Sequence, residues 1–276
     1  MTKEIEKYVS RRTLAFGEIR YYDHGRGVPL VLIHGMFGDF LDWEPVLETL
    51  SEACRVIAVD LPGFGESSKP RIEYSAELFT EALHDLFAQL EVKRVVLAGN
   101  SFGGQLAILY ALRYPEMVAK LVLVNSGGFR KWTAEEIALT ESRFTEQALG
   151  AVTPQINAIL FANVFTRQTE TSVRYLQKQN SKLERSDYPA YAYVVARSIH
   201  LSLTSFLTDR VGELRCPTLL VWGEQDPVLP LPQAEAALKC LQNGQLQTLP
   251  GCGHAPQLEC PKEFMKNVIP FLNDAH

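Results

Sequence analysis

Short apolar runs that end in small or polar residues recur along this chain, and they constrain its fold more than any other feature. The runs are PLVLI at 29–33, RVIAV at 55–59, RVVLA at 94–98, KLVLV at 120–124, TLLVW at 218–222 and a weaker one at 245–249. They are continuously apolar rather than alternating, which is typical of strands buried on both faces of a parallel sheet. The sequence therefore predicts a sheet covered by helices on both sides.

Helical patterns and two further strands complete the expected α/β order. Apolar residues recur at three- and four-residue spacing over 75–90, and the segments 105–113 and 261–272 follow the same pattern. Residues 8–22 predict two antiparallel strands that lead into the sheet. The alternation predicts an α/β fold, a doubly wound and mostly parallel sheet of eight strands.

One long stretch interrupts this alternation. Residues 130–212 contain no convincing strand and instead predict helices at 133–149, 154–163, 170–178 and 189–207. We interpret this stretch as a helical cap over the carboxyl edge of the sheet, with residues 1–129 and 213–276 forming the core. Ligands bind at the carboxyl ends of the strands in such sheets, so the chemistry is expected in the loops after the apolar runs.

Composition and charge exclude several classes of protein. The hydrophobic share of 46% is too high for a disordered chain, and a net charge of −5 gives no general attraction for nucleic acid or anionic lipid. No apolar run approaches the roughly 18 residues of a membrane span, and the N-terminal MTKEIEKYVSRR lacks the apolar core of a signal peptide. The five cysteines form no C-x-x-C pair, so we expect reduced thiols in a cytoplasmic protein.

The strongest local signal is GNSFGG at 99–104, which lies between an apolar run and a helical pattern. A strand that turns sharply into a helix strains its middle residue and leaves space only for small neighbours. Such a turn would expose the Ser101 hydroxyl at a helix N-terminus, where developing negative charge is favoured. The motif predicts Ser101 as a nucleophile; a glycine-rich turn with an ordinary serine is the alternative.

A serine nucleophile needs a base, and the positions of the six histidines select one. Only His254 lies on a loop after the last strand, at the expected edge. His34 ends the PLVLI run, where we expect it to order a loop. The others lie in an early turn, on a predicted helix, in the cap and at the C-terminus: His24, His84, His200 and His276.

The base in turn needs an acid that fixes its tautomer. Asp226 follows the TLLVW run directly and gives the chain order Ser, Asp, His that this kind of sheet favours. Glu224 is a weaker competitor, and Asp226-Pro227 could also form a simple Asx turn. The loop after KLVLV offers Asn125 and no carboxylate, which strengthens the choice of Asp226.

Acyl transfer also requires donors for the oxyanion. We expect one to be the backbone N–H of Phe102 and the other the N–H of Met36, in the loop HGMFGD after PLVLI. A plain turn at the strand end is the alternative for this loop. No zinc-ligand cluster is present in the sequence, so neither a metal nor an organic cofactor is expected.

Five segments in this order, HGMFGD, DLPGFGESSKP, GNSFGGQLA, GEQDPVLP and GCGH, resemble the α/β-hydrolase superfamily. The resemblance implies the α/β-hydrolase fold. It also implies that DLPGFGESS, which contains Asp60, Pro62, Gly63 and Gly65, is an architectural loop. Serine rather than a carboxylate at position 101 implies cleavage of an ester or of a carbon–carbon bond.

Within the superfamily, the GNSFGG motif, with Asn100 before Ser101, resembles that of the meta-cleavage-product hydrolases, which cut carbon–carbon bonds. Those enzymes usually have Trp after the catalytic His, where this chain has Ala255. They also use a cap arginine for the substrate carboxylate, and spacing does not choose among Arg167, Arg174, Arg185 and Arg197. We therefore predict a carboxylesterase first and a carbon–carbon hydrolase second. A cofactor-free peroxidase or perhydrolase and a non-catalytic ligand-binding protein remain alternatives.

The expected substrate is a small, mainly apolar ester, without nucleic acid or membrane as a partner. Candidate pocket residues are Gly35, Phe37, Asn100 and Trp132. Cap aromatic residues could line the acyl or alcohol pocket, although residues at helical spacing more often pack a core: Trp132, Phe144, Phe161, Phe165, Tyr188, Tyr191, Tyr193 and Phe206. Cys252 lies close to His254 in sequence and is not expected to be the nucleophile.

Overall fold

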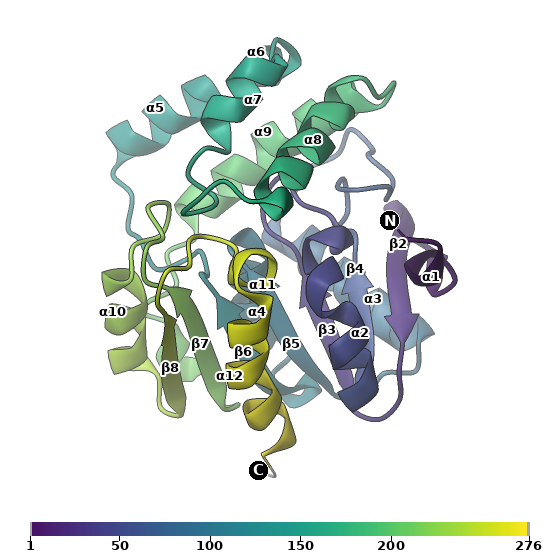
Figure 1. Ribbon diagram of the computed structural model, residues 1–276, viewed down its shortest axis with the longest axis vertical. Helices are drawn as coiled ribbons and strands as arrows, with labels where there is room; N and C mark the ends of the chain where they lie inside the picture. The colour runs from purple at the N-terminus through teal and green to yellow at the C-terminus, as the bar shows by residue number, and fades with distance from the viewer. Residues whose placement is uncertain (1, 275–276) are drawn as a thin grey trace.

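A computed structural model describes residues 2–274 and forms an eight-stranded sheet with helices on both faces (Figure 1). The strands are β1 (Val9–Leu14), β2 (Gly17–His24), β3 (Pro29–Ile33), β4 (Arg55–Val59), β5 (Val95–Asn100), β6 (Val118–Val124), β7 (Thr218–Gly223) and β8 (Gly244–Leu249). Their order across the sheet is β1-β2-β4-β3-β5-β6-β7-β8. The predicted eight-stranded α/β sheet is therefore confirmed.

Strand pairing explains why the carboxyl ends of the strands can form a site. From β4 to β8 all neighbours are parallel, whereas β1 and β2 are antiparallel additions at one edge. The register pairs Ile33 with Gly99, Asn100 with Val124, and Gly223 with Leu249. The loops after β3, β5, β6, β7 and β8 therefore leave the sheet at one edge.

Burial follows the position of each strand in the sheet. Every residue of the central strands β5 and β7 is buried, as expected for strands covered on both faces. The edge strand β8 alternates between half-buried and exposed positions until its buried last residue, Leu249. That alternation is the physical reason why its apolar run is the weakest of the six.

Helices pack on both faces of the sheet and form a separate group at its carboxyl edge. They are α1 (Lys3–Glu6), α2 (Glu44–Ala53), α3 (Ala76–Gln89), α4 (Phe102–Arg113), α5 (Ala134–Arg143), α6 (Glu146–Gly150), α7 (Pro154–Leu160), α8 (Glu170–Leu183), α9 (Tyr188–Thr204), α10 (Pro232–Cys240), α11 (Pro256–Glu259) and α12 (Pro261–Asn273), with the 3-10 helices η1 (Phe40–Trp43), η2 (Pro115–Met117) and η3 (Val211–Glu213). Trp43 and Phe264 belong to the core under α2 and α12, and Phe79 and Leu106 to the core under α3 and α4.

The cap helices α5 to α9 all lie between β6 and β7 in the chain and above the sheet in Figure 1. Two predicted cap helices differ most from the observed ones, while α7 and α9 each end three residues before the predicted end. The segment 133–149 divides into α5 and α6, because Thr145 begins a new helix by accepting a hydrogen bond from the Ala148 N–H. Helix α8 continues to Leu183, past the predicted end at 178. Helices α2 and α10 have no counterpart among the predicted helical ranges.

The structure contradicts one expectation about the cysteines. Cys252 and Cys260 form a disulfide, because the loop after β8 folds back onto the start of α12 and brings their Cα atoms to 6.3 Å. Cys54, Cys216 and Cys240 are free. Within residues 2–274, no helix is both long enough and apolar enough to cross a membrane.

Candidate active site

Ser101 lies at the turn from β5 into α4, in a conformation that few residues adopt. It is half-buried and has φ 54° and ψ −118°. The glycines around it are required by contact: a Cβ atom on Gly99 would lie 2.3 Å from the Gly103 oxygen, and one on Gly103 would lie 2.3 Å from the Ile33 oxygen. The tight turn leaves Ser101 at the N-terminus of a 12-residue helix, where the macrodipole favours negative charge.

His254 and Asp226 are in direct contact at the same edge of the sheet. His254 Nδ1 lies 2.8 Å from Asp226 Oδ2, and both side chains are buried. The other carboxylate oxygen, Oδ1, accepts the backbone N–H groups of Val228 at 2.8 Å and Leu229 at 3.0 Å. These bonds fix the carboxylate, which in turn favours the His254 tautomer with its proton on Nδ1.

Asn125 is a site residue that the sequence reasoning missed. Its Nδ2 donates to Asp226 Oδ2 at 2.5 Å, and its Oδ1 accepts the Gly223 N–H at 3.1 Å. Its φ of 40° bends the chain directly after β6. The available signal is its position, because Asn125 directly follows β6 at the same edge of the sheet as Asp226.

Asn100 connects the serine turn to the histidine loop. Its Nδ2 donates to the backbone oxygens of Val124 at 3.0 Å and His254 at 3.1 Å. On the other side, the His254 N–H donates to the Val164 oxygen in the cap at 3.0 Å. The backbone of His254 is thus held both by the residue before Ser101 and by the cap.

The loop after β3, residues 34–39, approaches Ser101 closely and is called the oxyanion loop below. A Cβ atom on Gly35 would lie 3.2 Å from the Ser101 Cβ, so the backbone that precedes Met36 faces the serine. Phe37 has a φ of 66°, which is uncommon for a bulky residue. The Phe102 N–H belongs to the first turn of α4, next to Ser101.

The four predicted pocket residues have different surroundings. Gly35 faces Ser101, and Asn100 is buried and bonded as described above. The Phe37 ring packs against the cap rings of Phe144 at 6.0 Å and Phe161 at 5.5 Å between centroids. Trp132 lies where the chain enters the cap, and the Arg130 guanidinium stacks 3.7 Å from its ring centroid.

His34 orders the oxyanion loop, as expected from its sequence position. Its Nδ1 lies 2.8 Å from the Gly35 oxygen, and its Nε2 accepts the Leu61 N–H at 3.1 Å. Full burial lowers the pKa of His34 to about 4, so the ring is neutral at pH 7. A neutral ring with its proton on Nδ1 satisfies both hydrogen bonds.

Asp60 has an architectural position beside this loop. Its carboxylate accepts the Phe40 and Glu66 N–H groups, both at 2.8 Å. Burial raises the pKa of Asp60 to about 6, with a further contribution from the negative charge of Asp39. Gly65, at φ 52°, leaves no space for a side chain next to this carboxylate. These contacts agree with the expected architectural role of the DLPGFGESS loop.

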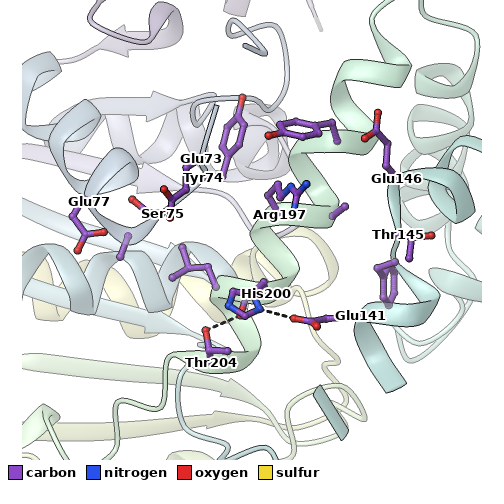
Figure 2. A pocket seen from close by; sticks show the side chains of 15 residues that line it. Glu73, Tyr74, Ser75, Glu77, Glu141, Thr145, Glu146, Arg197, His200 and Thr204 are labelled. Carbon is purple, nitrogen blue, oxygen red and sulfur yellow. Dashed lines mark hydrogen bonds and ion pairs between the residues drawn. The ribbon is translucent and has the colours of Figure 1, made fainter. Parts of the chain in front are cut away.

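A cleft of about 830 Å³ lies between the cap helices α5 and α9 and the start of α3 (Figure 2). Phe144 and Tyr193, two of the predicted cap aromatics, line it. Its other walls are largely polar, and His200 Nδ1 lies 2.6 Å from Glu141 Oε1 inside it. Ser101, Asp226 and His254 are not part of its lining. The cleft therefore lies between the cap and the core, and it does not include the three candidate catalytic residues.

The four cap arginines considered for a substrate carboxylate are all exposed. Arg174 lies 3.6 Å from Glu170, Arg185 pairs with Asp187 at 2.8 Å, and the Arg197 guanidinium stacks on the Tyr193 ring. The fourth is Arg167, beside the groove between α7 and α8. Among residues 2–274, no group of three or more His, Cys, Asp or Glu side chains could hold a metal ion.

A comparison with known protein families now places the chain. The sequence model of the alpha/beta hydrolase fold matches residues 28–261, most of the chain. The chain belongs to the α/β-hydrolase family. Membership identifies the protein as a hydrolase of this fold.

Relatives within this family have several activities. The chain is 29% identical to a 2-hydroxy-6-oxo-2,4-heptadienoate hydrolase of Pseudomonas putida, with 96% of each chain covered. Among solved structures it resembles a thermophilic esterase from Thermogutta terrifontis, at 26% identity and a TM-score of 0.81 over 96% of this chain and 97% of that one. It also resembles a bromoperoxidase from Bacillus anthracis, at 25% identity and a TM-score of 0.82 over 96% and 100%.

Proposed function

We propose that this protein is a serine hydrolase that cleaves carboxylic esters of small, mainly apolar substrates. The observation that carries the proposal is the buried His254–Asp226 pair, 2.8 Å apart, at the edge where the strained Ser101 turn emerges. A nucleophile, a base and an acid at one strand edge are the requirements of acyl transfer.

The reaction has two steps. His254 takes the Ser101 proton as the Ser101 oxygen attacks the ester carbonyl, and Asp226 stabilises the resulting imidazolium. The Met36 and Phe102 N–H groups hold the oxyanion, each contributing about 3 kcal/mol. His254 then protonates the leaving alcohol and activates the water that releases the acyl group from Ser101.

Carbon–carbon bond hydrolysis is the second candidate. The named relative from Pseudomonas putida and the Asn100-Ser101 sequence favour it. Two features favour the ester instead. Ala255 follows His254 where the resemblance leads one to expect Trp, and the cap arginines that could hold a dienoate carboxylate are exposed.

Turnover of p-nitrophenyl acetate and butyrate tests the proposal. The wild type should hydrolyse both esters, and Ser101→Ala should lower kcat by a factor of about 10³ or more without loss of folded protein. Ser142→Ala, on the exposed side of a cap helix, is the matched control and should keep wild-type kcat. Equal rates for the wild type and Ser101→Ala would remove the ester proposal.

Two further assays on the same preparations rank the alternatives. Decay of the visible absorbance of a meta-cleavage dienoate, faster than ester turnover and dependent on Ser101, would make carbon–carbon hydrolysis the function. Peracid-dependent halogenation at rates comparable to ester turnover would favour a perhydrolase. Ligand binding without any Ser101-dependent turnover would favour a non-catalytic member of the fold.

A further inference from the structure

Helix α8 of the cap reaches down to the oxyanion loop through two lysines. Lys182 Nζ donates a hydrogen bond to the backbone oxygen of Phe37. One turn earlier, Lys178 Nζ contacts Asp39 Oδ1 at 2.5 Å and Asp42 Oδ1 at 2.8 Å. A distant segment of the chain thus holds both the carbonyl of Phe37 and the carboxylate of Asp39, which ends the loop.

The loop needs such support because its conformation is unfavourable. Phe37 is a bulky residue at a φ of 66°, which costs on the order of 1 kcal/mol or more and persists only where the surroundings enforce it. Gly38 leaves no space for a side chain, since its Cβ would lie 2.3 Å from Asp42 Oδ2. Asp39 accepts the Leu41 N–H at 3.0 Å and so begins η1. The three loop residues after Met36 are therefore each held in place by their surroundings.

Resting on the function proposed above, we propose that Lys182 is a positioning residue for the oxyanion hole. Its bond to Phe37 holds the peptide conformation that presents the Met36 N–H to the carbonyl oxygen of the substrate. The oxyanion hole then forms only when α8 packs against the core. Lys182 acts through the loop and does not touch the reacting atoms.

The charged end of Lys182 is largely buried. Its side chain is 11% exposed, and its Nζ lies 3.9 Å from Asp39 Oδ2 and 5.6 Å from the centroid of the Tyr191 ring. Beside it is a small cavity of about 140 Å³. The titratable groups that line this cavity with Lys182 come from several elements: Arg20, Asp39, Glu66, Lys69, Lys178, Arg185, Asp187, Tyr188 and Tyr191. The charge of Lys182 also interacts with Asp42, Asp60 and His34.

Burial lowers the pKa of Lys182 to about 8, and the negative charges of Asp39, Asp42 and Asp60 only partly offset it. Above pH 8 the side chain becomes a neutral amine and loses its attraction to Asp39, so the Phe37 carbonyl is held less firmly. We expect kcat to fall there. The folded pKa lies below the unfolded value of 10.5, so this group adds stability to the folded state as the pH rises from 8 to 10.5. The loss of kcat is therefore not a loss of fold.

Variants of Lys182 test this assignment through the pH profile of kcat and KM for p-nitrophenyl butyrate between pH 6 and 10. Lys182→Met should lower kcat at pH 7 about tenfold or more, leave KM nearly unchanged, and lose the decline above pH 8. Lys182→Arg, which stays charged, should recover much of the rate and move the decline beyond pH 10. Lys239→Met, an exposed lysine on α10, is the control and should keep the wild-type profile.

The assignment would be overturned if Lys182→Met kept the kcat of the wild type and also its decline above pH 8. If Lys182→Met does not fold, Lys182→Arg decides: a decline that stays near pH 8 in this variant contradicts the proposal. Circular dichroism at pH 9.5 separates loss of kcat from loss of fold in every variant.

The rate of Ser101 phosphonylation by a p-nitrophenyl phosphonate separates this proposal from the ester proposal. The phosphonyl oxygen needs the same oxyanion donors, but no ester has to be a substrate. Slower labelling in Lys182→Met, with no ester turnover by the wild type, would support the positioning role and reject the ester function. If the wild type hydrolyses esters, and Lys182→Met has the same labelling rate and the same kcat as the wild type, only the positioning role is rejected.

Discussion

At the scale of single residues, the candidate site depends on polar groups that the reaction itself does not consume. Asp226 accepts hydrogen bonds from the His254 ring, from two backbone N–H groups and from the Asn125 amide. Asn100 and Asn125 each connect the end of one strand to the loop of another. Buried networks of this kind orient a base because every donor and acceptor is satisfied in only one arrangement.

Asn125→Ala tests the importance of this network. The substitution removes one donor to Asp226 and leaves the Gly223 N–H without its acceptor, so we expect kcat to fall about tenfold and the free energy of unfolding to fall by about 1–3 kcal/mol. Urea unfolding and ester turnover measure the two effects. Asn267→Ala, a half-buried asparagine on α12 whose amide donates to the backbone oxygen of Glu263, is the control and should change neither. Unchanged kcat in Asn125→Ala would show that Asp226 is oriented without the amide.

At the scale of elements, the cap is joined to the core by specific contacts and not only by apolar packing. The Gln105 amide of α4 donates to the backbone oxygens of Ser202 at 3.2 Å and Ser205 at 3.0 Å at the end of α9. The Lys178 ammonium of α8 lies between the carboxylates of Asp39 and Asp42. These contacts set where the cap sits relative to Ser101.

Lys178→Met tests the ionic contact of α8. It removes the nearer cation of Asp39 and the cation that pairs with Asp42, two buried carboxylates, and we expect the free energy of unfolding to fall by about 2–3 kcal/mol at pH 7. Burial raises the pKa of Asp39, but the charges of Lys178 and Lys182 outweigh burial and hold this pKa below its usual value of 3.8. The ionised carboxylate therefore adds stability that is lost as the pH falls below 3.8. The double variant Lys178→Met with Asp39→Asn should recover part of the loss in urea unfolding. A double variant as unstable as the sum of its single variants would contradict direct coupling.

At the scale of the whole molecule, two buried groups give the unfolding free energy opposite dependences on pH. The lowered pKa of His34 means that the unfolded chain binds its proton first, so stability falls as the pH drops from 6.5 to about 4. The raised pKa of Asp60 means that the folded chain binds its proton first, so stability rises as the pH drops from about 6 to 3.8. Between these limits the two contributions oppose each other.

Asp60→Asn therefore should make the loss of stability below pH 6 steeper, because the contribution of His34 is then unopposed. Thermal unfolding of the variant and the wild type at half-unit steps from pH 7 to 4 measures the slopes. The variant also loses the ion pair with Arg20, which shifts the whole curve, so the difference in slope and not the midpoint is the test. Parallel curves would mean that Asp60 does not change its protonation in this range.

The sequence by itself determined the sheet and the serine turn. Continuous apolar runs specify buried parallel strands, and the glycines at 99 and 103 are required by backbone contact, so both are local properties that spacing reveals. The same spacing gave the order of Ser101, Asp226 and His254, whose roles stay predictions, as do the cap boundaries at 130 and 213. The tertiary structure alone decided that Asn125 bonds Asp226, that Cys252 pairs with Cys260, and that Lys182 of the cap holds Phe37. Each of these contacts joins segments whose approach depends on how strand ends, loops and cap pack together, and no local pattern of residues encodes that distance.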